Sequence, residues 1–188
     1  MKVKGAVLLS RAAFVKKSFG DKAWMEVLSA LPSDDGTDYA GLLASSWYPF
    51  EVGQRLDDAI VRVLGKGDRK VFEDLGAASA RENLTTVHRT FVAGRDPQGF
   101  MEKAPVIYGF YYDTGRRTWE RTGPSSGVMT TYDAGSYSAV DCLTVIGWYR
   151  EALGMCGAGD VVVQETACRA RGDAVCRYEF RWRSGPGG

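Results

Sequence analysis

Two cysteines near the C-terminus have the spacing of a chelating pair. Cys168 and Cys176 flank a short segment in which Gly172 and Asp173 are residues that favour a tight turn. Thiols at the two ends of such a turn can face each other across a hairpin. The pattern therefore predicts two sulfur ligands held close together.

Two further potential ligands accompany this pair. Glu165 lies three residues before Cys168, and Cys142 lies in a segment with helical periodicity that can pack on the hairpin. Three thiolates and one carboxylate make a closed tetrahedral set for zinc. In a regular strand, residues three apart point to opposite faces, so Glu165 and Cys168 can share a metal only if the strand bends or ends between them.

The same cysteines also suit a core without metal. Free cysteine packs as a small hydrophobic residue and is among the most buried residue types. Spacing alone therefore leaves two interpretations open for Cys142, Cys168 and Cys176. Cys156 lies outside the pattern, and we expect it to be packed in the core.

Length and composition limit the kind of protein that positions these residues. The 188 residues, of which 45% are hydrophobic and 25% charged, suit one globular domain. The net charge of +1, without a basic run, argues against nucleic acid as a partner. The apolar run at the N-terminus is too short for a signal peptide, and no run is long enough for a membrane span. We therefore predict a cytoplasmic protein, whose cysteines stay reduced.

The first half of the chain has helical periodicity. Gly20 and Pro32 are expected to end two successive helices. The helices predicted in this half cover residues 11–20, 21–31, 39–46, 52–64 and 68–93. In the fourth of them, Asp57 is predicted to face solvent.

The second half changes to a period of two residues, which is typical of strands. The predicted strands cover residues 106–112, 117–121, 127–132, 160–168 and 174–183, with a helix over 138–153 that carries Cys142 on its inward face. This order predicts an α+β fold, in which an N-terminal helical lobe is followed by an antiparallel sheet packed with a long helix. The Gly- and Pro-rich tail, 184–188, is predicted to be disordered.

The pattern Cys142-x22-Glu165-x2-Cys168-x7-Cys176, followed by alternating aromatic residues over 178–182, resembles the 4-vinyl reductase domain. This family includes the sensor modules of phenol-responsive bacterial transcription activators. The corresponding residues of those sensors hold a structural zinc. The resemblance therefore implies a zinc site made of these four residues.

The layout of the whole chain resembles a superfamily that unites 4-vinyl reductase domains, haem nitric oxide/oxygen sensor domains and TRAPP core subunits. Within it, the chain is most similar to an uncharacterised, largely myxobacterial family. The resemblance implies one domain over residues 1–183, with a helical lobe over 1–96 and the sheet and helix over 97–183. It also implies a pocket for a small hydrophobic or aromatic ligand between sheet and helices, lined by Tyr108, Phe110, Tyr112, Trp119 and Trp148.

The only histidine raises the question of haem. Haem sensors of this superfamily bind iron through one helix histidine and hold the propionates with Tyr-x-Ser-x-Arg, which Tyr112-x-Thr114-x-Arg116 approaches. However, the gap from His88 to Tyr112 is shorter than in that family, and threonine replaces serine. We therefore expect zinc as the cofactor and no haem.

These observations predict a non-enzymatic sensory or small-molecule-binding module with a structural zinc. One histidine and three committed thiols leave few pairs of nucleophile and base. The output would pass through a homodimer or a partner protein, with 76–80 and 47–50 as candidate contact surfaces. One alternative is an assembly subunit similar to the TRAPP core subunits, without a ligand. Further alternatives are a haem-based gas sensor or an accessory subunit of a tetrapyrrole reductase.

Overall fold

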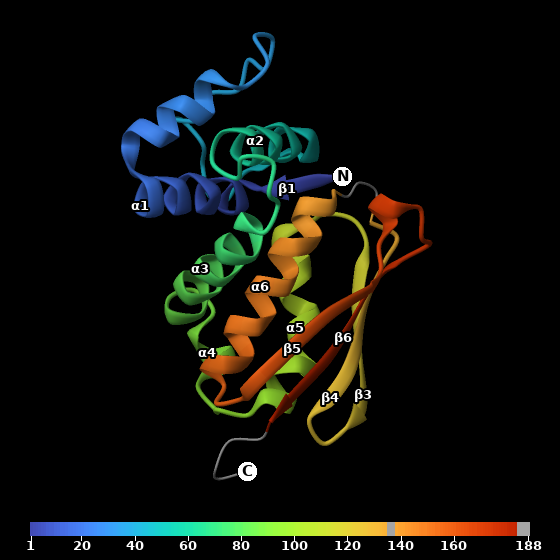
Figure 1. Ribbon diagram of the computed structural model, residues 1–188. Coiled ribbons are helices and arrows are strands. Elements are labelled where there is room, and N and C mark those ends of the chain that lie inside the picture. Colours follow the sequence, from blue (N-terminus) through green and yellow to red (C-terminus); the bar gives the residue numbers. More distant parts are fainter. Residues whose placement is uncertain (135–137, 184–188) are drawn as a thin grey trace.

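The computed structural model describes residues 1–134 and 138–183, and it confirms the predicted α+β fold. A helical lobe sits at one end of a four-stranded antiparallel sheet (Figure 1). The predicted disorder of 184–188 concerns residues outside those described. Among the described residues, no helix is both long and apolar enough to cross a membrane.

The helical lobe is built from the first third of the chain. Its elements are β1 (Lys2–Lys4), α1 (Gly5–Ser29), β2 (Trp47–Pro49) and α2 (Phe50–Val63). β1 pairs antiparallel with β2. The predicted break at Gly20 is confirmed: φ is 88° and ψ is 167° there, a conformation that glycine adopts without strain.

The predicted helix over 39–46 is wrong, because this segment is a loop. The carboxylate of Asp38 accepts hydrogen bonds from the backbone N–H groups of Ala40, at 3.1 Å, and Gly41, at 3.0 Å. Such local side-chain bonds compete with helix formation.

Two helices, α3 (Val71–Thr85) and α4 (Arg89–Val92), replace the predicted continuous helix over 68–93. The hydroxyls of Thr85 and Thr86 each donate to a carbonyl of the preceding turn, both at 2.7 Å. At Thr86 the backbone leaves the helical region, with φ −117° and ψ −96°. Hydroxyl bonds of this kind weaken a helix, so the long periodic pattern is interrupted here.

The predicted strand over 106–112 is wrong, because α5 (Pro97–Tyr111) runs through it. Pro97 occupies a first-turn position, where its missing N–H costs nothing. The buried residues Phe100, Met101, Ala104, Ile107 and Tyr108 recur at helical spacing. Burial at a period near 3.6 therefore overrides the strand preference of β-branched and aromatic residues in this segment.

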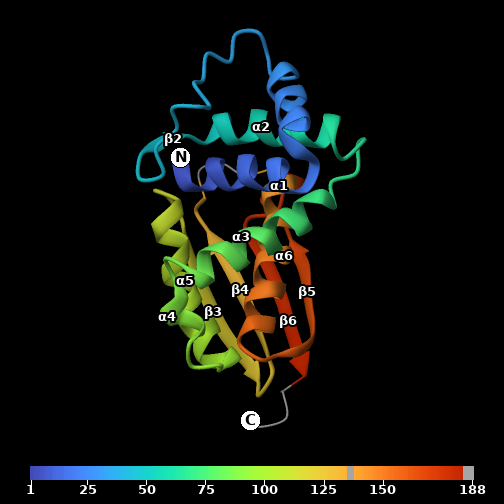
Figure 2. The same cartoon turned by 90° about the vertical axis from the view of Figure 1, so that its left-hand side faces the viewer.

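Four strands form the sheet, and α6 packs on it. The elements are β3 (Arg116–Gly123), β4 (Ser126–Tyr132), α6 (Ala139–Met155), β5 (Gly159–Ala167) and β6 (Cys176–Arg183). The spatial order is β3-β4-β6-β5, and all neighbours are antiparallel. Figure 2 shows α3, α5 and α6 on the same side of this sheet. These elements confirm the predicted strands after residue 116 and the predicted helix.

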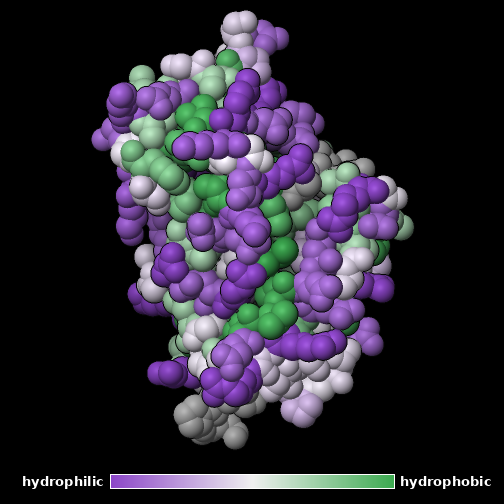
Figure 3. All heavy atoms as spheres, viewed as in Figure 1, coloured by the Kyte–Doolittle hydropathy of each residue, from purple (hydrophilic) through white to green (hydrophobic). Residues whose placement is uncertain are grey.

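Two hydrophobic clusters fill the interior. One lies between α5, α6 and the sheet, and includes Tyr178 and Phe180 from the inward face of β6. The other joins α1, α2 and the start of α3, around Leu8 and Leu56. The face that carries α6 and β5 is mostly hydrophilic, with a narrow apolar band between these two elements (Figure 3).

The small residues of α3 lie against α6 of the same chain. A Cβ atom added to Gly76 would overlap the carbonyl of Thr144, and one added to Gly147 would overlap the carbonyl of Glu73. This close approach explains why 76–80 is rich in small residues. The predicted contact surface at 76–80 is therefore largely used inside the chain, with Gly76 and Ala80 buried.

Candidate functional site

The three predicted thiol ligands meet where α6 begins, beside the turn between β5 and β6. The Sγ atom of Cys142 lies 3.6 Å from that of Cys168 and 3.9 Å from that of Cys176. All three sulfur atoms lie within 4.8 Å of one another, and all three residues are buried. Zn–S bonds of about 2.3 Å at tetrahedral angles separate two sulfurs by about 3.8 Å. The thiols therefore suit three corners of one tetrahedral site.

Local structure places each thiol. The hydroxyl of Ser138 caps α6 by accepting a hydrogen bond from the N–H of Asp141 at 3.2 Å, which puts Cys142 in the first helical turn. Cys168 directly follows β5, and Cys176 is the first residue of β6. The start of α6 therefore lies next to the turn between β5 and β6.

The turn between the last two cysteines is held by Asp173. Its carboxylate accepts from the N–H of Cys168 at 2.7 Å, and its own N–H donates to the carbonyl of Cys168 at 3.2 Å. The short helix η1 (Arg169–Arg171) ends at Gly172, whose φ of 98° favours glycine. The predicted turn residues therefore act as expected.

Hydrogen bonds at the sulfur atoms favour a thiolate on Cys176. Its pKa lies below the ordinary value, chiefly because of the hydrogen bond with Cys142 and also because of the N–H of Arg169. That N–H donates to the Cys176 sulfur at 3.4 Å. The hydrogen bond with Cys176, followed by burial, raises the pKa of Cys142. A cluster that already stabilises one thiolate is suited to a metal, because thiolates are the ligating form.

Glu165 lies beside this cluster but outside the group of three close ligand atoms. Its Oε2 atom accepts from Nη1 of Arg171 at 2.6 Å. Its Oε1 atom is buried and has no hydrogen-bond partner among the described residues. The pKa of Cys168 is raised by burial first and also by the negative charge of Glu165. The register of β5 shifts between Glu165 and Ala167, so the strand is irregular where a shared metal requires it.

Cys156 lies at the opposite end of α6, where it is the C-cap residue. It is completely buried in the core and does not belong to the thiol cluster. Burial raises its pKa to about 12. This position agrees with the packing role predicted for it.

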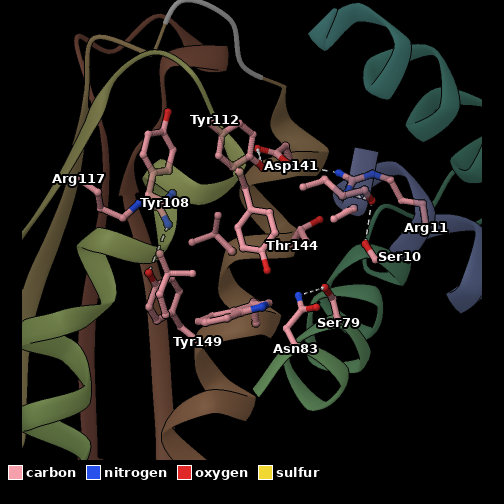
Figure 4. A pocket seen from close by; sticks show the side chains of 16 residues that line it. Ser10, Arg11, Ser79, Asn83, Tyr108, Tyr112, Arg117, Asp141, Thr144 and Tyr149 are labelled. Carbon is pink, nitrogen blue, oxygen red and sulfur yellow. Dashed lines mark hydrogen bonds and ion pairs between the residues drawn. The ribbon is translucent and has the colours of Figure 1, made fainter. Parts of the chain in front are cut away.

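A cavity of about 80 Å³ lies between α1, α3, α5, α6 and β3 (Figure 4). For comparison, an engineered apolar cavity of about 150 Å³ holds benzene. The lining combines aromatic, polar and charged side chains with a few aliphatic ones. The sixteen lining residues are Ala6, Val7, Ser10, Arg11, Ser79, Asn83, Ile107, Tyr108, Tyr111, Tyr112, Arg117, Asp141, Thr144, Val145, Trp148 and Tyr149.

The cavity contains three of the five predicted pocket residues. These are Tyr108, Tyr112 and Trp148. Phe110 instead points outward, with 45% of its surface exposed. Trp119 packs on Phe180 and Trp182 inside the hydrophobic core, and it does not line the cavity.

Arg117 is a cavity residue that the sequence analysis missed. Its Nε atom donates to Oγ1 of Thr131 at 3.0 Å, and its Nη1 atom donates weakly to the hydroxyl of Tyr149 at 3.4 Å. Its guanidinium carbon lies 4.7 Å from the ring centre of Tyr108. Strand alternation could have found it, because Arg117 is two residues from the inward-facing Trp119.

A buried polar network closes the other side of the cavity. Arg11 donates to both oxygens of Asp57, at 2.6 and 3.1 Å, and to Asp141 at 3.3 Å. The hydroxyl of Tyr112 donates to Asp141 at 3.1 Å. The prediction that Asp57 faces solvent is wrong: it is 2% exposed, because Arg11 of the neighbouring helix supplies a charged partner that helical periodicity cannot reveal.

The histidine and the Tyr-x-Thr-x-Arg segment do not come together in the cavity. Nε2 of His88 lies 2.9 Å from the hydroxyl of Tyr111, and the imidazole is not among the lining groups. Tyr112 lines the cavity, whereas Arg116 is exposed and stacks over the ring of Tyr132. The arginine that lines the cavity is Arg117, which follows Arg116 in β3.

The thiol cluster and the cavity share one helix. α6 provides Cys142 to the cluster, and it provides Asp141, Thr144 and Trp148 to the cavity wall. Because Asp141 and Cys142 are adjacent, the first turn of α6 contacts both sites. A group that holds the three thiols in place therefore also restrains the part of the cavity wall that α6 provides.

The fold resembles solved H-NOX structures over nearly its whole length. No family model matches the chain, and no curated protein matches it. An unliganded Fe(II) H-NOX mutant from K. algicida is 9% identical, with a TM-score of 0.72 over 97% of this chain and 98% of that one. A mutant H-NOX protein from S. oneidensis in the Fe(II) ligation state is 12% identical, with a TM-score of 0.74 over 98% of both chains. The superfamily fold is thus supported, while the likeness to 4-vinyl reductase domains depends on the sequence motif alone.

The comparison contradicts the expectation of no haem. A further similar structure carries the name "Probing the function of heme distortion in the H-NOX family"; it is 10% identical, with a TM-score of 0.75 over 98% of this chain and 97% of that one. The short gap from His88 to Tyr112 and the threonine in place of serine are local features of the sequence, and they carry no information about the overall fold. Haem therefore has to be considered as a group for this cavity.

The cavity meets part of what haem requires. Arg117, Tyr108 and Tyr112 offer polar groups on its wall, but Tyr111 stands between His88 and the open space. A porphyrin is much larger than a cavity of about 80 Å³, so binding it requires the cavity wall to open. In the arrangement described here, the space fits a smaller ligand.

Proposed function

We propose that the chain is a small-molecule-binding sensory module stabilised by a zinc ion. The observation that carries this proposal is the shared helix: α6 forms one wall of the cavity and also bears a thiol of the cluster. A ligand that contacts Asp141, Thr144 or Trp148 acts on a helix whose start the metal holds in place.

We assign the zinc to Cys142, Cys168 and Cys176, with Glu165 as the fourth ligand. The sulfur separations support the three thiolates, and the buried, unpartnered Oε1 of Glu165 supports the carboxylate. Four protein ligands leave no open position for water, so the role is structural. This arrangement ties α6 to the β5–β6 turn, as in the 4-vinyl reductase sensors that the motif resembles.

We assign the ligand to the cavity beside α6. Aromatic and aliphatic side chains line it together with polar and charged groups that can orient a small molecule. The signal would leave through a homodimer or a partner protein that contacts the helical lobe, which the Arg11–Asp57–Asp141 network connects to α6. Trp47, with 39% of its surface exposed, lies on the candidate contact surface 47–50.

Elemental analysis and native mass spectrometry test this proposal. Freshly purified protein, without added metal, should contain close to one zinc per chain and a co-purifying small molecule. Zinc without any small molecule, beside a tightly held partner chain, would favour an assembly subunit. Absence of zinc, with thiols that react only after unfolding, would reduce the cluster to ordinary core packing.

A haem-based sensor is the second candidate, favoured by the whole-length likeness to H-NOX structures. His88 is the residue that would ligate the iron, and haem supplies the gas-binding chemistry when bound. Protein purified from haem-supplied cells should then show a Soret band that His88→Ala removes and Phe91→Leu keeps. A band that His88→Ala leaves unchanged would point to another ligand or to nonspecific binding.

A further inference from the structure

Arg117 is a cavity cation that has no counterion in the part of the chain that the structure describes. The lining contains three charged side chains: Arg11, Arg117 and Asp141. Among the described residues, no carboxylate oxygen lies within 4.0 Å of the Arg117 guanidinium, whereas Arg11 is paired with Asp57 and Asp141. Figure 4 shows Arg117 on the opposite side of the cavity from Arg11.

Neutral groups hold the guanidinium in place. Thr131 accepts from Nε, Tyr149 accepts from Nη1, and the ring of Tyr108 lies under the guanidinium carbon. Among the described residues, Nη2 has no protein acceptor. Arg117 is half-buried and lines the cavity, so its unused donors are available to a group bound there.

No described group can easily replace the missing counterion. Among the described residues that line the cavity, Asp141 is the only acidic one, and its oxygens already accept from Arg11 and Tyr112. A charge removed from bulk water without a partner is costly, and a guanidinium is the side chain best shaped to bind a carboxylate through two parallel hydrogen bonds.

We propose that the cavity binds a small organic carboxylate, held by Arg117. The inference rests on the proposed ligand-binding function and names its ligand class. The carboxylate accepts from the free Nη2 and from the hydroxyl hydrogen of Tyr149, whose oxygen receives Nη1. The rest of the ligand lies against Ile107, Val145 and Trp148.

The size of the cavity limits the body of this ligand. About 80 Å³ is smaller than the space that holds benzene in an engineered cavity, about 150 Å³. A short aliphatic acid fits without rearrangement, and an aromatic acid requires a small opening of the wall. We therefore expect affinity to rise from acetate to butyrate and to fall at benzoate.

Calorimetric titration of the purified full chain tests the inference. The probes are acetate, butyrate and benzoate, each beside its uncharged amide, at equal ionic strength in a buffer without competing carboxylates. The acids are ionised at pH 7. Because hydrogen bonds to charged groups are stronger than those to neutral ones, butyrate should bind about tenfold more tightly than butanamide, or better.

Three variants separate recognition by Arg117 from a general effect of charge. Arg117→Gln should remove the preference for acids over amides. Arg117→Lys keeps the charge but loses the fork, so it should retain part of that preference. Arg116→Gln is the matched control, because Arg116 is the exposed neighbour on the same strand and should change nothing.

The outcomes distinguish this inference from the function on which it rests. If acids and amides bind equally well to the wild-type protein, the cavity binds ligands but Arg117 is a structural cation between aromatic rings, and the inference fails alone. If no member of either series binds, both the inference and the ligand-binding function fail. The comparison of acids with amides needs no variant, so misfolding of Arg117→Gln cannot obscure it.

Discussion

The sulfur of Cys142 lies 3.6 Å from the sulfur of Cys168, so the first turn of α6 touches the end of β5 through two thiols. These residues are 26 positions apart in the chain. A metal bound there joins a helix and a hairpin that otherwise meet only by side-chain packing. Metal binding should therefore contribute directly to folding free energy.

Loss of either hairpin thiol should lower both zinc content and thermal stability. A ligand present at 1,000 times its Kd stabilises by about 4 kcal/mol, which corresponds to about 8 to 16 °C in Tm for a chain of this size. Cys168→Ser and Cys176→Ser should each show a fall of this order by calorimetry, with less than one zinc per chain. Cys156→Ser is the control and should keep its zinc. Equal zinc content in all three variants would contradict the assigned ligands.

Glu165→Gln should have a smaller effect than loss of a thiol. An amide oxygen can still bind zinc weakly, but it carries no charge to balance the metal. We expect the zinc Kd to rise about tenfold in competition with a chromogenic chelator, at unchanged stoichiometry. Glu179→Gln, which removes a half-buried carboxylate of the same hairpin that pairs with Arg181, should leave the Kd unchanged. If the two variants behave alike, the fourth ligand is not Glu165.

Gly76→Ala should destabilise the chain because α3 and α6 have no room for a methyl group between them. The added Cβ meets the backbone carbonyl of Thr144, which cannot move away without shifting α6. Overpacking of this kind costs about 1 to 3 kcal/mol. Gly109→Ala is the matched control in α5, where nothing lies within 4 Å, and it should be neutral or slightly stabilising. Urea unfolding measures both.

The Arg11–Asp57 pair should make stability depend on pH between about 4 and 6. Burial raises the pKa of Asp57 from 3.8 to about 6, and the attraction of Arg11 only partly opposes this. Because the folded state holds this proton more tightly than the unfolded state, the stabilisation is fully present below about pH 4 and is lost as pH rises through 6.

Urea unfolding at a series of pH values checks this sign. The stability of the wild-type protein relative to Asp57→Asn should fall as pH rises from 4 to 7, since the asparagine variant lacks the titrating group. Asp58→Asn removes the neighbouring exposed carboxylate, and its stability should depend on pH in the same way as that of the wild-type protein. A difference that grows with pH would mean that Arg11 dominates and holds the pKa of Asp57 low.

The sequence predicted the fold class and the thiol cluster because both leave local signals. The residues between Cys168 and Cys176 predicted a tight turn that places these two thiols close together. Helical periodicity predicted that Cys142 lies on the inward face of its helix. The strand predicted over 106–112 failed because Ile107 and Tyr108 have strand propensity, while the contacts that bury them at helical spacing come from distant elements. Propensity is a weak guide where tertiary packing decides.

The cavity was predictable only in part. Aromatic composition pointed to Tyr108, Tyr112 and Trp148, but it could not separate lining rings from core rings such as Trp119. The Arg11–Asp57 pair joins residues 46 positions apart, and the sequence around each one carries no sign of the other. Long-range charge pairing of this kind becomes visible only in three dimensions.

Removal of zinc should weaken the binding of a small carboxylate, because one helix serves both sites. The metal would hold Cys142, and the adjacent Asp141 forms part of the cavity wall. Without the metal, this turn becomes more mobile, and ordering it on binding costs affinity. We expect a fall of about fivefold or more in butyrate affinity after chelation, measured by calorimetry on protein that circular dichroism shows to be folded. Linkage requires butyrate to strengthen zinc binding by the same factor.

Cys156→Ser, which leaves the thiol cluster intact, is the control and should retain the wild-type affinity for butyrate. Equal butyrate affinities for folded protein with and without zinc would show that the two sites act independently.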